Sequence, residues 1–289
     1  MKAINKVVIP IAGYGSRMFP ATLGVTKAML PILNKPVIQI ILEECVKAGI
    51  NHVILVISPS QDAVIDYFSL KNQDAIKKFS DKDSVKELKE LVSKIKIDYV
   101  IQHEQKGLGH AILITKDLVN GEDFGVILGD NPILHKDIYG IGELYQAYKE
   151  NSAYYIGLKE VDASDTSKYG IVSFCEREND KQVLLDEMIE KPKINPPSNL
   201  AALGRYILKN SIFSYLEVTM AGVGGEIQLT DALRMAIKQE KVYGYLLDGH
   251  ILDSGNKVGF FETNLAFAMQ DKDIKNKILE MIEKYKEEE

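Results

Sequence analysis

The chain has 289 residues, 46% of them apolar and 26% charged, which predicts one large globular domain or two small ones. Its formal net charge of −6 at pH 7 argues against a general affinity for nucleic acid, which needs a basic surface. Two cysteines support neither a disulfide framework nor a thiolate metal site, and no apolar run approaches the ~18 residues of a membrane span, so we expect a cytoplasmic protein that contacts no membrane.

Short β-branched runs alternate with helical patterns in the first half of the chain. Buried parallel strands are predicted at 6–12, 52–58, 97–102 and 124–130. Two apolar stripes at helical spacing lie between them, the first at Val37, Ile40, Ile41, Cys45 and Ala48 and the second at Val85, Leu88, Leu91, Val92 and Ile95. Gly49 is placed to end the first helix. This order predicts an α/β fold, a Rossmann-like mixed sheet flanked by helices.

The pattern loosens after about residue 150. Short strands are predicted at 154–161, 169–174 and 182–189, and helices close the chain. With no repeat, low-complexity tract or linker in the sequence, we expect a single domain, 1–289, in which a smaller insert of short strands serves specificity. Its parts are a first half, 1–150, a second half, 151–260, and C-terminal helices, 261–289.

A glycine pair and two cations follow the first predicted strand. Ligands bind beyond the carboxyl ends of strands in such sheets, and Gly13 and Gly15 would let the backbone N–H groups approach a bulky anion. Arg17 and Lys27 would add positive charge, so a triphosphate is the expected ligand, although a plain tight turn is the competing interpretation. The loop lacks the third glycine of a nicotinamide-binding fingerprint and the Gly-Lys-Ser/Thr of a P-loop.

Two further stretches follow predicted strands. In the first, Gly107 would leave room for a flat ring whose edge Gln102 reads, unless the stretch is only a βα turn. His110 opens the next helix and is expected to be structural. In the second, Asp130 ends a strand near the phosphate loop, where one carboxylate plus phosphate oxygens would suit Mg²⁺.

Together these motifs resemble the sugar-1-phosphate nucleotidyltransferases, in particular the bacterial UTP:glucose-1-phosphate uridylyltransferases. The resemblance rests on G-x-G-[ST]-R-x-x-P-x-T, K-x-M-L-P, Q-x-x-x-x-G-L-G-H-A and G-D, and then on KYGIV, EKP, PSNLAALGRYIL, GGEIQLTDAL and DSGNKVGF. It extends from about residue 5 to about residue 270. It implies transfer of the uridylyl group of UTP to α-D-glucose 1-phosphate, which gives UDP-glucose and pyrophosphate by in-line attack on the α-phosphorus.

The resemblance also implies roles for residues of the nucleotide-binding half. The backbone at Ala12, Gly13 and Gly15 would hold the nucleotide, and Gln102 and Gly107 would bind uracil. Arg17 and Lys27 would face the triphosphate, chiefly the pyrophosphate that leaves.

The sugar-binding half would hold the second substrate. Lys191 would grip glucose 1-phosphate, Glu190 would accept hydrogen bonds from the sugar hydroxyls, and Gly170 and Gly204 would complete the pocket. Removing Lys27 or Lys191 should lower the rate more than it harms the fold. Read without the resemblance, Glu190 and Lys191 form an ordinary exposed pair before a proline.

Magnesium is the implied cofactor. Asp130 would hold Mg²⁺ between the reacting phosphates, and Asp253 would be a second ligand, directly or through water. The alternative for Asp253 is that it only starts a turn at Gly255.

The sequence departs from the uridylyltransferase pattern on the nucleotide side. Leu23, Thr26 and Ala28 replace a lysine, a proline and a glutamate, and Asn131 replaces an aspartate. A dTTP:glucose-1-phosphate thymidylyltransferase and a non-catalytic regulatory paralogue therefore remain alternatives. By analogy with relatives we expect a homodimer or homotetramer, with the amphipathic segment 264–285 as the packing element.

Overall fold

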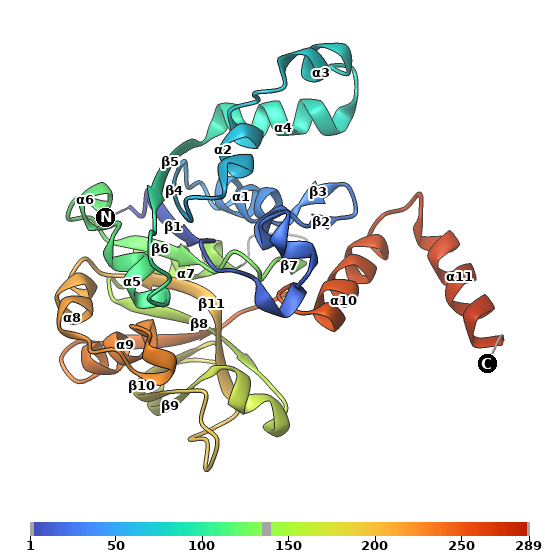
Figure 1. Cartoon of the computed structure of the whole chain (residues 1–289). Coiled ribbons are helices and arrows are strands. Elements are labelled where there is room, and N and C mark those ends of the chain that lie inside the picture. The colour runs from blue at the N-terminus through green and yellow to red at the C-terminus, as the bar shows by residue number, and fades with distance from the viewer. Residues whose placement is uncertain (1–2, 135–139, 288–289) are drawn as a thin grey trace.

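A computed structural model describes residues 3–134 and 140–287 of the chain. Nine strands form one mixed sheet (Figure 1), in the order β5 (Lys96–Ile101), β4 (His52–Ile57), β1 (Lys6–Pro10), β6 (Phe124–Ile127), β11 (Leu200–Leu208), β8 (Tyr154–Glu160), β12 (Val242–Leu246), β10 (Gln182–Glu190) and β9 (Gly170–Arg177). Two small ladders pair β2 (Pro31–Ile32) with β3 (Lys35–Pro36) and β7 (Ile133–Leu134) with β13 (His250–Ile251). The predicted α/β fold with a mixed sheet is therefore confirmed.

Helices cover both faces of the sheet. One core lies under α1 (Val37–Lys47), α2 (Asp62–Phe68), α4 (Asp83–Lys94) and α7 (Ile141–Glu150). The other lies under α5 (Leu108–Leu113), α6 (Lys116–Val119), α8 (Ile212–Val218) and α9 (Leu229–Ile237). Val7 and Ile9 of β1 point into the first core and Val8 into the second, which is why the strand is apolar throughout rather than alternating.

The predicted strands and helices of the first half are mostly confirmed, with two differences. α1 ends as expected, since Gly49 has φ +80° and its N–H donates to the Val46 carbonyl. The strand predicted as buried at 97–102 is the sheet's edge, so β5 is only half-buried. The strand predicted at 124–130 ends at Ile127, and Asp130 lies in the following loop.

Strand β11 joins the two halves of the chain. Its residues 205–208 pair with β6 and residues 200–201 with β9, while β8 pairs with 200–202 and again with 206–207. The strand bends at Gly204, whose φ is +75° and whose carbonyl accepts a hydrogen bond from the Leu128 N–H. The short strands predicted in the second half are β8, β9 and β10, and they continue the sheet of the first half.

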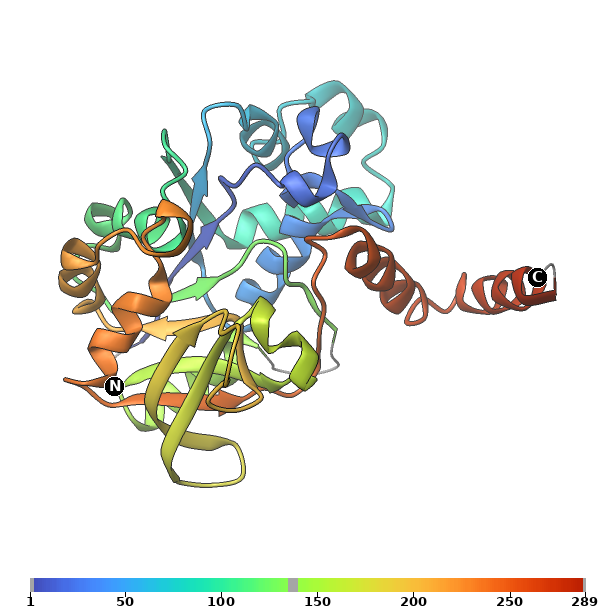
Figure 2. The same cartoon turned by 60° about the horizontal axis from the view of Figure 1, so that its bottom comes forward.

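Three other helices lie at the margins. They are α3 (Gln73–Lys78), α10 (Lys257–Ala268) and α11 (Lys275–Glu287). The α10 residue Asn264 accepts a hydrogen bond from the Leu33 N–H through Oδ1, at 2.9 Å, which ties α10 to the β2–β3 turn. α11 extends away from the rest of the chain in both views (Figures 1 and 2). None of the helices in the described ranges is long and apolar enough to cross a membrane.

Candidate active site

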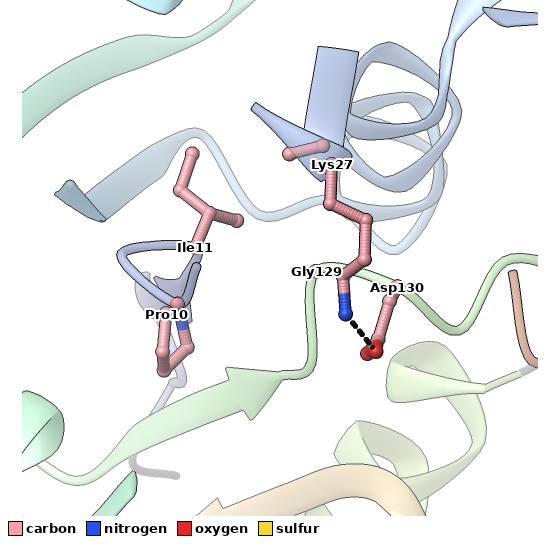
Figure 3. A pocket seen from close by; sticks show the side chains of 7 residues that line it. Pro10, Ile11, Lys27, Gly129 and Asp130 are labelled. Carbon is pink, nitrogen blue, oxygen red and sulfur yellow. Dashed lines mark hydrogen bonds and ion pairs between the residues drawn. The ribbon is translucent and has the colours of Figure 1, made fainter. Parts of the chain in front are cut away.

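A cavity of about 110 Å³ opens where the first strands end at their carboxyl side. It is lined by Pro10, Ile11, Gly13, Lys27, Ala28, Gly129 and Asp130. The side chains of Lys27 and Asp130 point toward each other across it (Figure 3), with Lys27 Nζ 2.5 Å from Asp130 Oδ2. The structure thus brings together a cation and a carboxylate that lie 103 positions apart in the sequence.

The glycine loop before Lys27 is stabilised by a hydrogen bond between two of its own residues, and the space beside Gly13 is open. Gly15 has φ +64°, and a Cβ there would lie 3.2 Å from Lys27 Cβ. Thr22 Oγ1 donates a hydrogen bond of 2.9 Å to the Gly15 carbonyl. A Cβ at Gly13 would meet no atom of the described residues within 4 Å, so the space beside this glycine is open.

A second hollow of about 120 Å³ lies on the other side of Gly13. Ala12, Leu23 and Thr26 are among its lining residues. The buried Ala28 instead lines the first cavity. Of the residues that depart from the uridylyltransferase pattern, therefore, only Ala28 faces the Lys27–Asp130 pair.

The Arg17 guanidinium group lies near both predicted metal ligands, Asp130 and Asp253. Its Nη2 is 4.0 Å from Asp130 Oδ2 and its Nη1 is 3.9 Å from Asp253 Oδ2. A Cβ at Gly255 would lie 2.7 Å from Arg17 Nη2, 2.7 Å from Asp130 Oδ2 and 2.8 Å from Asp253 Oδ1. Both carboxylates therefore converge on Gly255, where an added Cβ would push against the ends of these three side chains.

Ser254 fixes the Asp130 loop from the second half of the chain. Its N–H and its Oγ donate to the Asp130 carbonyl oxygen at 2.9 and 2.8 Å, and Ser254 is 1% exposed. Sequence reasoning assigned Asp253 as a ligand, named Gly255 only as a turn residue and missed Ser254, although all three belong to the DSG motif. Asn131 is buried, and its Nδ2 donates to the Leu252 carbonyl at 3.4 Å, so its amide is used inside the protein.

The pair of carboxylates suits Mg²⁺, which binds to one or two carboxylates plus phosphate oxygens. Asp130 uses Oδ2 for Lys27 and Arg17, while its Oδ1 accepts no hydrogen bond from residues 3–134 or 140–287. Asp253 accepts from the Gly255 N–H at 2.8 Å and from Asn256 Nδ2 at 3.0 Å, which orients its carboxylate and also forms the turn that was the alternative interpretation. Across those same ranges, no cluster of three or more His, Cys, Asp or Glu is placed around a metal position, so substrate oxygens would have to complete the coordination.

The Gln102 loop lies at the carboxyl end of β5. Gln102 is 4% exposed, and its Nε2 donates to the Gly107 carbonyl at 3.3 Å and lies 2.9 Å from His110 Nδ1. Gly107 has φ +96°, and a Cβ there would lie 2.8 Å from the Ile227 carbonyl oxygen. The Gln102 amide nitrogen thus holds the loop, and among residues 3–134 and 140–287 no hydrogen bond to its side-chain carbonyl oxygen is made.

His110 is predicted to be neutral at pH 7. Burial lowers its pKa below the usual 6.5, and the positive charge of Lys106 lowers it further. The neutral ring can accept the Gln102 hydrogen bond at Nδ1, whereas protonation as the pH falls below 6.5 would put a second donor there and break it. An NMR titration of the His110 ring should give a pKa below 6.5, and a value of 6.5 or higher would contradict the hydrogen bond as described.

The predicted sugar-site residues form a second group. Lys191 Nζ is 3.0 Å from Glu190 Oε1, and Glu190 Oε2 accepts a hydrogen bond of 2.6 Å from Thr230 Oγ1. The Lys191 side chain is 52% exposed, whereas that of Glu190 is only 16% exposed. The interpretation of an ordinary exposed pair therefore fits Lys191 but not Glu190. A Cβ at Gly170 would lie 3.4 Å from Glu190 Oε2, which places Gly170 beside this carboxylate. Gly204 instead supports the bend of β11.

Tyr169 supports the second group and was missed by sequence reasoning. Its carbonyl accepts the Lys191 N–H at 3.0 Å, which holds Lys191 at φ +46°, a conformation that is unusual outside glycine. Burial raises the pKa of the Tyr169 hydroxyl, and the negative charge of Asp253 raises it further. The KYG motif contains Tyr169, but nothing in the motif indicates that its carbonyl holds Lys191.

Comparisons with known proteins agree with this arrangement. A family model described as nucleotidyl transferase matches residues 6–270. UTP–glucose-1-phosphate uridylyltransferase 2 of Staphylococcus saprophyticus is 41% identical over 289 residues, which cover 99% of each chain. The UTP–glucose-1-phosphate uridylyltransferase of Bacillus subtilis is 38% identical over 287 residues, 98% of this chain and 97% of that one.

The fold agrees as well. A crystal structure of UDP-glucose pyrophosphorylase complexed with UDP-glucose has a TM-score of 0.86 and 34% identity, and covers 93% of this chain and 100% of that chain. The chain therefore belongs to the nucleotidyl transferase family, and the resemblance to its UTP–glucose-1-phosphate uridylyltransferases is confirmed.

Proposed function

We propose that the protein transfers the uridylyl group of UTP to α-D-glucose 1-phosphate and releases pyrophosphate. The observation that carries the proposal is the cluster of Arg17, Lys27, Asp130 and Asp253 beside an open glycine loop. Two cations at a glycine loop suit a triphosphate, and relatives at 38–42% identity are named for this reaction.

The reaction needs two anions held in line and little covalent chemistry from the protein. We assign the triphosphate to the Gly13 loop, with Arg17 and Lys27 facing the pyrophosphate that leaves. Lys27 now pairs with Asp130 at 2.5 Å, so a bound phosphate would compete with that carboxylate for the ammonium group. We assign the phosphate of glucose 1-phosphate to Lys191 and the sugar hydroxyls to Glu190.

Magnesium is part of the proposal. Asp130 and Asp253 would hold Mg²⁺, which when bound would neutralise charge on the phosphates. The support is the convergence of both carboxylates on Gly255.

The direct test is pyrophosphate release from the purified protein with Mg²⁺ and glucose 1-phosphate, offered UTP, dTTP, ATP, CTP and GTP in parallel. We expect turnover with UTP. A preference for dTTP would show that Ala28 and its neighbours have changed the base, and binding of UDP-glucose without any turnover would support the regulatory paralogue instead.

Lys191 gives a prediction for the sugar side. Replacing Lys191 with methionine should raise KM for glucose 1-phosphate about tenfold or more, because one charge-assisted hydrogen bond is lost, and leave KM for UTP nearly unchanged. Initial rates at varied concentrations of each substrate measure both constants. The matched control is Lys193→Met, two residues on at an exposed position, which should change neither constant. An equal rise in both KM values for Lys191→Met would place Lys191 elsewhere.

We also propose a cytoplasmic homodimer or homotetramer that packs through the C-terminal helices. The support for assembly is that Leu279, Met281 and Tyr285 are exposed on α11, a helix that extends away from the rest of the chain (Figure 2). An isolated helix of 13 residues is marginally stable in water, so a partner would stabilise it. The support for the cytoplasm is that Cys45 and Cys175 are free. Light scattering of the full chain beside a Met281→Lys variant tests the assembly.

A further inference from the structure

The side chain of Gln61 joins three segments at the edge of the phosphate loop. Its Nε2 donates to the Ile11 carbonyl at 2.9 Å and to Thr26 Oγ1 at 2.8 Å. Its Oε1 accepts a hydrogen bond of 3.0 Å from the Ser58 N–H. Gln61 is 6% exposed, so both amide hydrogens and the carbonyl oxygen are used inside the protein.

Each segment leads directly into the candidate site or supports it. Ile11 follows β1 and precedes the Ala12–Gly13 turn, and its N–H donates to the Val56 carbonyl of β4 at 2.8 Å. Ser58 follows the last residue of β4. Thr26 is the residue before Lys27, and its carbonyl accepts the Met29 N–H at 2.8 Å, which starts the single 3-10 turn Lys27–Met29.

We propose that Gln61 is a positioning residue that holds Lys27 at the triphosphate through Thr26, an inference that rests on the function proposed above. Between Gly13 and Thr26 the chain is largely exposed, so it offers little packing to fix the start of the Lys27 turn. The Gln61–Thr26 hydrogen bond ties that start to the ends of two buried strands. A proline at position 26 has no side-chain hydroxyl and could not accept this hydrogen bond.

The Thr26 hydroxyl allows a narrow test, because Thr26→Val removes only that one partner of Gln61. In an otherwise unchanged enzyme it should lower kcat with UTP about three- to tenfold, the usual worth of one hydrogen bond, with KM for glucose 1-phosphate unchanged. Thr26→Ser keeps a hydroxyl and should restore most of the rate. Gln61→Met, which loses every bond, should cost up to about 100-fold.

A double-mutant cycle that combines Thr26→Val with Lys27→Ala distinguishes a positioning role of Gln61 from general support of the fold. If Gln61 acts through Lys27, Thr26→Val should change kcat little once Lys27 is already alanine. The matched control is Thr115→Val, which removes another threonine hydroxyl, a buried one that donates to the Ile112 carbonyl at 2.7 Å, and should leave kcat unchanged in both backgrounds. An equal loss from Thr26→Val in both backgrounds would overturn the inference.

Hydrogen exchange tests the same inference without activity. Loss of the Gln61 bond should speed exchange of the Met29 and Leu30 amides, which bond to the Thr26 and Lys27 carbonyls. Thr115→Val should not affect them. A wild-type protein without turnover would contradict the proposed function alone, whereas unchanged exchange in Thr26→Val would contradict the positioning role whatever the activity.

Discussion

Replacing Asp130 with asparagine is expected to lower kcat about 100- to 1,000-fold, the usual cost of removing one group that acts on charge in a transition state. The carboxylate faces Lys27 at 2.5 Å and Arg17 at 4.0 Å, so its charge orders both cations as well as any metal. Asparagine keeps the size of the side chain, and the backbone at Asp130 stays anchored by Ser254. Pyrophosphate release with UTP and glucose 1-phosphate measures the loss.

The matched control for this change is Asp83→Asn. Asp83 starts α4, is exposed and, among the described residues, pairs with Lys86 alone, at 2.9 Å, so its replacement should leave kcat unchanged. Thermal unfolding of both variants should resemble that of the wild type. If Asp130→Asn kept more than half of the wild-type kcat, the carboxylate would have no part in the reaction.

Much of the fold could be predicted because single elements carry their own signal. Strand β1 is apolar at every central position since its two faces pack into different cores, and α4 shows a stripe of Leu88, Leu91 and Val92 against charged residues. The bend of β11 could not be predicted. It depends on Gly204 standing opposite Leu128 of the loop after β6, a contact made by the sheet order and not by any local pattern.

The candidate site was predictable to the same degree. The Gly13 loop and Asp130 follow strands that end at one edge, and a parallel sheet brings such ends together. Ser254 and Gly255 reach Asp130 because β13 pairs with β7 beside the Asp130 loop. The sequence shows the DSG motif, but it does not show that the motif lies next to Asp130. Tyr169 escaped for another reason, since its hydrogen bond to Lys191 is made by its backbone carbonyl group, which no residue type signals.

A buried ion pair links the two halves of the chain, and the loss of either partner alone should destabilise the fold. Arg205 of β11 is fully buried, and its Nε and Nη2 donate to Glu44 of α1 at 3.2 and 2.6 Å. Glu44 Oε1 also accepts the Ile141 N–H at 2.9 Å. Replacing Glu44 with glutamine should lower the free energy of unfolding by about 3–5 kcal/mol, because it leaves a buried guanidinium group without its counter-charge.

Glutamine can still accept from Ile141 through Oε1, but an amide donor replaces Oε2 opposite Arg205 Nη2, so the change removes the charge and one hydrogen bond. Urea unfolding measures the loss, and Glu90→Gln, which breaks the exposed Glu90–Lys94 pair on α4, should leave the midpoint unchanged. The double variant Glu44→Met/Arg205→Met removes both charges and should recover much of the stability. Two transitions for Glu44→Gln would show that the two halves of the chain unfold separately. One transition at a lower urea concentration would show that the two halves, joined by β11 and this ion pair, unfold as a single cooperative unit.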